Sequence, residues 1–331
     1  MIAAVLICVG AMVIWARQPV LAPGQATIEF SVKPGSGVRS TAQQIAGENI
    51  PINPLLLEIL ARVTGKSARL KAGHYELKPG ATPIGLIRQL VRGEFAQESL
   101  PIIEGWTFRQ MRQAIAQQPA LKHDTAALSD TELLAKITTD YTLPEGLFFP
   151  DTYLFAKGAS DLQVYRQAHA AMLKRLSDAW TKRDPSLPYQ TPYEALTMAS
   201  IIEKETGQKA ERGMIAGVFA NRLKAGMLLQ TDPTVIYGMG EKYQGTIRKR
   251  DLETDTPFNT YTRLGLPPSP IALPGKAALA AALNPEKTGA LYFVARGDGS
   301  SAFSSNLTDH NRAVNKYRRS AGPNSATPVQ Q

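Results

Sequence analysis

The chain has 331 residues, of which 44% are hydrophobic and 20% charged, the balance of an ordinary globular protein with two or three folded units. Its formal net charge of +9 favours an anionic environment, such as nucleic acid, a membrane surface or an acidic cell-wall polymer. Because the cations are scattered and no RNA- or DNA-binding motif accompanies them, we expect no nucleic-acid partner.

Several kinds of chemistry lack the residues that they need. The single cysteine, Cys8, excludes an intramolecular disulfide. No pair of histidines has the close spacing of a metal site, so we expect no metal, and nothing in the sequence indicates another cofactor. The sequence has neither a phosphate-binding GxxxxGK[ST] motif nor a GxSxG nucleophile elbow, which argues against nucleotide hydrolysis and serine-esterase chemistry.

The N-terminal segment is typical of a membrane helix. Every residue from Ile2 to Ala16 is apolar or glycine, and Trp15 and Arg17 have the character of interfacial residues. The stretch is short for a full span, and it lacks the basic start and good cleavage site of a signal peptide. We predict a retained anchor over residues 1–17 and a linker over 18–26, and leave the true start codon and helix length open.

The first folded unit is predicted over residues 27–95. It opens with an alternating apolar strand and contains a near-repeat, because FSVKPG at 30–35 and YELKPG at 75–80 lie 45 positions apart. An amphipathic helical pattern follows each copy, and a further helix is predicted over 54–64. The order strand, helix, helix, strand, helix gives a compact α+β module. Its layout resembles a LysM-type glycan-binding module; the alternative is a small packed domain that acts only as a spacer.

The second, larger unit is predicted over residues 96–319. A strand over 100–103 leads into a helix, residues 119–140 have a polar and irregular pattern, and a long helix is predicted over 161–182. The whole chain is therefore assigned to the α+β class. Residues 320–331 are polar with two prolines, and we expect this tail to be disordered.

A helix predicted over residues 193–206 carries the main candidate for catalysis. An apolar stripe with spacing i, i+3, i+4, i+7 ends in a carboxylate: Met198, Ile201, Ile202, Glu205. If that face lines a cleft, burial and the negative end of the helix dipole both raise the pKa of Glu205, as a general acid requires. The alternative is a solvated glutamate at a helix end, paired with a nearby cation.

A second acid, Glu203, lies on the same predicted helix. It is about 200° around the helix from Glu205, so the two side chains cannot share one site if the helix continues through both. The face of the helix that carries Glu203 contains both apolar and polar residues, which suggests that Glu203 forms a structural hydrogen bond or ion pair.

Polar residues further along are candidates for substrate contact. Thr231 or Asp232, before Pro233, predicts a helix N-cap followed by proline at N1, with a sugar contact as the alternative. The other candidates have side chains suited to sugar hydroxyls or N-acetyl groups: Gln230, Tyr237, Asn259, Tyr261, Asn306. Asparagines in turns are more often satisfied by their own backbone, so a structural role for Asn259 and Asn306 stays open.

Several segments in this order resemble the endolytic murein transglycosylases of the MltG or YceG-like family, from about Thr27 to Arg319. They include EGLFFPDTY (145–153), ASIIEKET (199–206), NRL (221–223), LQTDPTVIYG (229–238), NTYT (259–262), GLPP (265–268) and FSSNL (303–307). The resemblance implies a single-pass anchor in the cytoplasmic (inner) membrane, a LysM-like module, and a catalytic domain in the periplasm or outside the cell. It also implies peptidoglycan as the substrate, makes cell-wall synthesis proteins candidate partners, and assigns catalysis to Glu205.

The resemblance implies a lyase that cleaves between MurNAc and GlcNAc in nascent strands. Glu205 protonates the leaving oxygen, and its carboxylate then accepts the C6 hydroxyl proton as a 1,6-anhydro ring closes, so one acid suffices. Two alternatives remain. A muramidase-type hydrolase needs a second acid, with Asp232, Glu145 and Asp151 as candidates. A non-catalytic glycan-binding scaffold for cell-wall synthesis needs no catalytic acid, and the glutamate would be structural.

Overall fold

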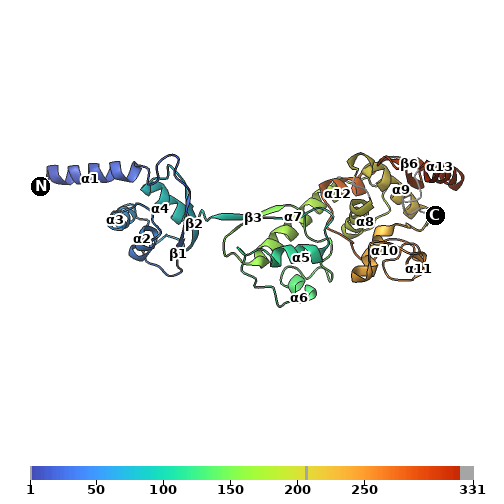
Figure 1. Ribbon diagram of the computed structural model, residues 1–331, viewed down its shortest axis with the longest axis horizontal. Helices are drawn as coiled ribbons and strands as arrows, with labels where there is room; N and C mark the ends of the chain where they lie inside the picture. Colours follow the sequence, from blue (N-terminus) through green and yellow to red (C-terminus); the bar gives the residue numbers. More distant parts are fainter. Residues whose placement is uncertain (1, 206–207, 321–331) are drawn as a thin grey trace. The chain divides into compact units, whose positions relative to one another are not determined.

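The computed structural model describes residues 2–205 and 208–320 and has a mixed α+β fold, which confirms the predicted class (Figure 1). Two compact units make up the chain. The first consists of residues up to 99 with 118–122 and 154–160, and the second comprises the remainder. The predicted boundaries near residues 18, 27, 96 and 320 stay predictions, and the predicted disordered tail lies outside the described residues apart from Ser320.

Helices and short strands alternate in the first unit, in the order predicted from the sequence. After α1 (Ile2–Arg17) come β1 (Ile28–Val32), α2 (Val38–Gly47), α3 (Pro54–Val63), β2 (Gly73–Leu77) and α4 (Pro83–Arg92). Across the described residues, no helix is both long enough and apolar enough to pass through a membrane.

The two copies of the near-repeat form one antiparallel pair of strands. β1 pairs with β2 so that Phe30 lies opposite Tyr75, and their rings stack with centroids 5.3 Å apart. Helices α2, α3 and α4 gather on one side of this pair in Figure 1. Both aromatic residues are buried in the core that the strands share with these helices. The similarity between the copies therefore reflects two matching halves of one small sheet.

Most elements of the second unit are helices. In chain order they and the short strands are β3 (Gln97–Pro101), α5 (Phe108–Ala116), α6 (Asp130–Ala135), β4 (Thr152–Ala156), α7 (Asp161–Thr181), α8 (Pro192–Glu205), η1 (Lys209–Glu211), α9 (Arg212–Lys224), α10 (Asp232–Met239), η2 (Gly240–Lys242), α11 (Lys249–Glu253), α12 (Lys276–Leu283), β5 (Tyr292–Ala295), β6 (Ser301–Ser304) and α13 (Leu307–Ser320). β3 pairs with β4, and β5 pairs with β6. The boundary between the two units runs through β3 and β4.

Two predicted features of this unit were wrong in detail. The strand predicted over 100–103 lies at Gln97–Pro101, and the stretch predicted as irregular contains α6. A capping box starts α6: Ser129 Oγ accepts from Glu132 N, while Glu132 Oε2 accepts from Ser129 N. With only six residues, α6 is too short to produce a clear helical period in the sequence.

Helix α8 runs through the centre of the second unit. Its residues 195–202 are all buried, and it packs against α7, α9, α10 and α12. Only its first and last turns leave this packed environment: Pro192 and Lys204 are exposed, and Glu205 is partly exposed. The fold thus brings the acidic C-terminal end of α8 to the edge of the core, beside the start of α10.

Candidate active site

The carboxyl of Glu205, at the last described residue of α8, is held by a hydroxyl from another part of the chain. Thr231 Oγ1 donates a hydrogen bond of 2.6 Å to Glu205 Oε2. Burial, with a smaller contribution from the neighbouring charge of Asp232, raises the pKa of Glu205 to about 7. The Thr231 hydrogen bond and the positive charge of Arg222 act in the opposite direction. Glu205 can therefore carry or release a proton near neutral pH.

The segment before α10 presents Thr231 to Glu205 through an unusual backbone. Gln230 has φ +50°, in the left-handed region that non-glycine residues seldom adopt. Two bonds to one residue hold the segment in place, since Gln230 N donates to Thr260 O at 3.0 Å and Thr231 N donates to Thr260 Oγ1 at 3.1 Å. Thr231 takes the predicted N-cap position, but its hydroxyl makes no cap hydrogen bond and is directed to Glu205 instead.

Asp232 and Tyr261 form a second polar pair next to Glu205. Tyr261 Oη donates a hydrogen bond of 2.6 Å to Asp232 Oδ1. Burial raises the pKa of Asp232, and burial together with the adjoining carboxylate raises the pKa of Tyr261. Three of the residues predicted from the sequence thus lie in one neighbourhood: Glu205, Asp232 and Tyr261 influence one another electrostatically.

Arg222 places a positive charge under this group of residues. Its side chain is completely buried, and Nη1 donates to Leu229 O at 3.0 Å and to Gln230 Oε1 at 3.3 Å. These bonds fix the segment that leads to Thr231, while the guanidinium charge favours the ionised form of Glu205. Neither Arg222 nor the hydroxyl of Thr231 was predicted from the sequence as a partner of Glu205. The only sequence signal was their position in the NRL and LQTDP motifs.

Glu203 points away from Glu205 and is used within the protein. Arg212 Nη2 forms an ion pair of 3.0 Å with Glu203 Oε1, and both side chains are at most 8% exposed. Glu203 Oε2 also accepts a hydrogen bond of 2.9 Å from Gly275 N, at the start of α12. These contacts support a structural role for Glu203.

Tyr237 lies near a different carboxylate. Its hydroxyl donates to Glu145 Oε2 at 3.1 Å, while Phe108 N donates to Glu145 Oε1 at 2.9 Å. Glu145 is buried, which raises its pKa to about 7. Both side chains line a cavity of about 660 Å³ whose wall includes Lys204 but not Glu205. Because Asp232 and Tyr237 are about 140° apart around α10, this helix directs them to different sites.

The remaining predicted residues are engaged by local structure. Asn259 is buried, and its Nδ2 donates to Leu252 O at 2.9 Å and to Thr254 O at 2.7 Å. Asn306 is exposed before α13, where its Oδ1 accepts from Asp309 N at 2.9 Å. The third candidate for a second acid, Asp151, is paired with Arg175 at 3.4 Å. These contacts support structural roles for the two asparagines.

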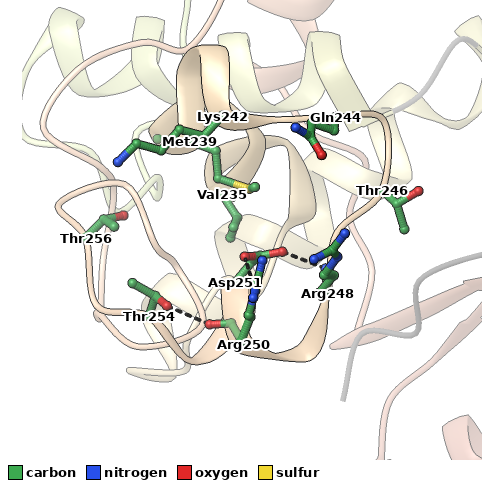
Figure 2. A pocket seen from close by; sticks show the side chains of 11 residues that line it. Val235, Met239, Lys242, Gln244, Thr246, Arg248, Arg250, Asp251, Thr254 and Thr256 are labelled. Atoms are coloured by element: carbon green, nitrogen blue, oxygen red, sulfur yellow. Dashed lines mark hydrogen bonds and ion pairs between the residues drawn. The ribbon is translucent and has the colours of Figure 1, made fainter.

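A second cavity, of about 410 Å³, lies along α10 and is rich in cations (Figure 2). Val235 and Met239 of α10 form part of its wall, and Lys242, Arg248 and Arg250 bring positive charge. Asp251 also lines it and accepts a hydrogen bond of 2.8 Å from Arg248 N. Among the residues that the structure describes, no cluster of three or more histidine, cysteine or acidic side chains could hold a metal ion. The expected absence of a metal or other cofactor stays a prediction.

Comparisons with known proteins agree over nearly the whole chain. Residues 30–316 match the model of the YceG-like family. A protein of Bacillus subtilis (strain 168) named endolytic murein transglycosylase is 32% identical over 317 residues, which cover 91% of this chain and 87% of that protein. A protein of the same name from Streptococcus pneumoniae (strain D39) is 28% identical, and the match covers 90% of this chain and 60% of that longer protein.

One solved structure also resembles this chain. The crystal structure of a putative yceG-like protein from Listeria monocytogenes superposes with a TM-score of 0.55 at 32% identity. The match covers 87% of this chain and 99% of the Listeria chain. The family model and the solved structure therefore both indicate YceG-like proteins.

Proposed function

The chain belongs to the YceG-like family, and we propose that it is an endolytic murein transglycosylase, a lyase that cuts peptidoglycan strands at internal MurNAc–GlcNAc bonds. The single observation that carries the proposal is the carboxyl of Glu205, which has a pKa of about 7 and is held by Thr231. The relatives' printed names support the choice of substrate and reaction.

In this proposal Glu205 acts first as an acid and then as a base. Its protonated carboxyl gives a proton to the departing GlcNAc oxygen while positive charge develops at MurNAc C1. The resulting carboxylate then accepts the proton of the C6 hydroxyl, whose oxygen bonds to C1 and closes a 1,6-anhydro ring. Because the nucleophile belongs to the substrate, its high effective concentration replaces an activated water. One carboxyl with a pKa near neutrality can perform both steps.

The neighbouring residues position this carboxyl and adjust its proton affinity. Thr231 fixes the orientation of Glu205, and Arg222 stabilises the carboxylate that forms after the first step. Asp232 and Tyr261 offer a hydrogen-bonded pair to the sugar beside the scissile bond. Gln230, whose strained backbone places it next to Thr231, is a further candidate for sugar contact.

A muramidase-type hydrolase is the second candidate function, and the closeness of Asp232 to Glu205 favours it over the remaining alternative. The charge of Asp232 raises the pKa of Glu205, which supports Asp232 as the second carboxyl that such a hydrolase needs to activate water. The two activities differ in their products, since a hydrolase leaves reducing ends and a lyase leaves anhydro ends. A non-catalytic scaffold would leave the strands intact.

Mass spectrometry of digested peptidoglycan tests these proposals together. The full chain is incubated with uncross-linked strands, and the ends and lengths of the products are identified. Anhydro-MurNAc ends on fragments from strand interiors are expected. Reducing MurNAc ends would overturn the lyase proposal in favour of the hydrolase. Strands left intact by the wild-type chain would favour the scaffold.

The remaining proposals concern organisation and location. We propose that α1 anchors the chain in the cytoplasmic membrane and that the catalytic domain lies in the periplasm or outside the cell. Its apolar sequence supports this, although α1 has only 16 residues. We propose a linker over residues 18–26, a LysM-like glycan-binding module over 27–95 and a catalytic domain over 96–319. Contact with cell-wall synthesis proteins would place the enzyme beside nascent strands.

A further inference from the structure

The cation-rich cavity on α10 differs from the Glu205 site in position and in charge. Three cations line it: Lys242 and Arg248 from the segment after α10, and Arg250 from α11. Asp251 is oriented by its bond to Arg248 N and lies 3.7 Å from Arg250 Nε, so it offsets part of the charge of Arg250. Within the described part of the chain, the side chains of Lys242 and Arg248 form no ion pair. The cavity therefore retains net positive charge.

Helix α10 connects this cavity with the Glu205 site along one face. Asp232, Val235 and Met239 have the spacing i, i+3, i+7, which places them on the same side of the helix. Asp232 lies beside Glu205, whereas Val235 and Met239 line the cavity. The rise from Asp232 to Met239 is about 10 Å. Three residues of extended peptide span about the same length, about 10 Å.

The wall of the cavity is rigidly joined to the same site. Asn259 Nδ2 donates to the carbonyls of Leu252 and Thr254, and Asn259 Oδ1 accepts from Tyr261 N at 2.8 Å. Tyr261 in turn donates its hydroxyl to Asp232. These hydrogen bonds fix the position of the cavity wall relative to Asp232, which lies beside Glu205.

We propose that this cavity binds the carboxylates of the peptide stem carried by the MurNAc residue at the cleavage site. This inference rests on the proposed function, because it names a part of the same substrate. Murein stems are short peptides with free carboxylates, and Lys242 and Arg248 supply the charge-assisted donors that such groups require. Figure 2 shows the polar side chains of Gln244 and Thr246 in the same wall, between Lys242 and Arg248 in the sequence. The enzyme would therefore distinguish stem-bearing strands from bare glycan.

A ratio of cleavage rates tests the inference. The double variant Lys242→Gln/Arg248→Gln is compared with the wild type on stem-bearing strands and on the same strands after removal of the stems. We expect the ratio of kcat/KM for the two substrates to fall about tenfold, the size of one charge-assisted hydrogen bond at a partly exposed site. Lys249→Gln is the matched control, because Lys249 lies on α11 but does not line the cavity. An unchanged ratio in the double variant, or an equal fall in the control, would overturn the inference.

A binding measurement separates this inference from the proposed function. A free stem peptide is titrated into the full wild-type chain while the NMR signal of the Met239 methyl group, which lies in the cavity wall, is followed. We expect a saturable shift that the double variant lacks and that an amidated, uncharged stem peptide does not produce. If the wild type cleaves neither substrate, the proposed function fails, yet this titration still decides whether the cavity binds the stem. Equal shifts with both peptides, or none with either, contradict it.

Discussion

Thr231 and Glu205, 26 positions apart in the sequence, are joined by a hydrogen bond of 2.6 Å between Thr231 Oγ1 and Glu205 Oε2. This bond favours the ionised carboxyl and therefore lowers the pKa that burial raises. In Thr231→Val, the shape of the side chain is kept but the donor is lost. We expect the pKa of Glu205 to rise and kcat to fall about tenfold, as the carboxyl loses its orientation. The pH profile of kcat measures both effects. A lower kcat with an unmoved profile would argue against the bond as a determinant of proton affinity.

Replacing Glu205 should abolish activity, whereas replacing Glu203 should mainly lower stability. Glu205→Gln removes the proton donor, and we expect strand cleavage to fall by about a thousandfold or more. Glu203→Gln breaks the buried ion pair with Arg212, which should lower the free energy of unfolding by about 3 kcal/mol while leaving measurable cleavage below the melting temperature. Cleavage assays and thermal melts of both variants check this. The opposite pattern would move catalysis to Glu203.

The pH dependence of activity follows from the raised pKa of Glu205. Protonated carboxyl is needed in the first step, so kcat should fall about tenfold per pH unit above pH 7. Glu145 has a similarly raised pKa and is the group most easily confused with Glu205 in such a profile. In Glu145→Gln, kcat should still fall above pH 7. If kcat of this variant no longer falls there, the pH dependence would be assigned to Glu145.

Stability should depend on pH for the same reason. The folded-state pKa of Glu205, about 7, is above the ordinary value of 4.5, so the folded state holds the proton more tightly between these limits. The protein should therefore lose stability as pH rises from 4.5 to 7, by up to about 3 kcal/mol from this residue. Glu205→Gln has no charge to bury, and it should be more stable than the wild type at pH 8 but nearly equal to it at pH 5. Urea unfolding at both pH values provides the comparison. If Glu205→Gln is no more stable than the wild type at pH 8, the carboxylate of Glu205 is not destabilised by burial.

Asn259 should matter for folding more than for sugar contact. Asn259→Ala takes the Asn259 donor from three backbone carbonyls and leaves Tyr261 N without its acceptor, so we expect a loss of about 2–3 kcal/mol in unfolding free energy. Asn306→Ala removes an exposed helix cap and should cost about 1 kcal/mol. Chemical denaturation compares the two. An Asn259→Ala chain of normal stability with a raised KM would restore the sugar-contact hypothesis for that residue.

Local patterns predicted most of the helices and strands, because apolar periods record which face of an element is buried. They could not predict which distant segments meet. Phe30 and Tyr75 were identified as equivalent residues of a repeat, but their pairing emerged only in the folded sheet. Thr231 has a residue type that suits helix capping, and nothing local indicates that its hydroxyl instead contacts a helix end 26 positions earlier. Tyr237 and Asp232 were both candidates for substrate contact, whereas in the fold Tyr237 donates to Glu145 and Asp232 accepts from Tyr261 beside Glu205.

The pairing of β1 with β2 has a particular symmetry. With an offset of 45 positions, Phe30 pairs with its own counterpart Tyr75, and Ile28 pairs with Leu77, the counterpart of Val32. Each strand therefore meets its equivalent as one subunit meets another across a twofold axis in an isologous homodimer. The first unit is in this respect a dimer within a single polypeptide. A fragment that contains one copy alone would present an unpaired strand edge, and its natural way to cover that edge is to associate with a second fragment of the same kind.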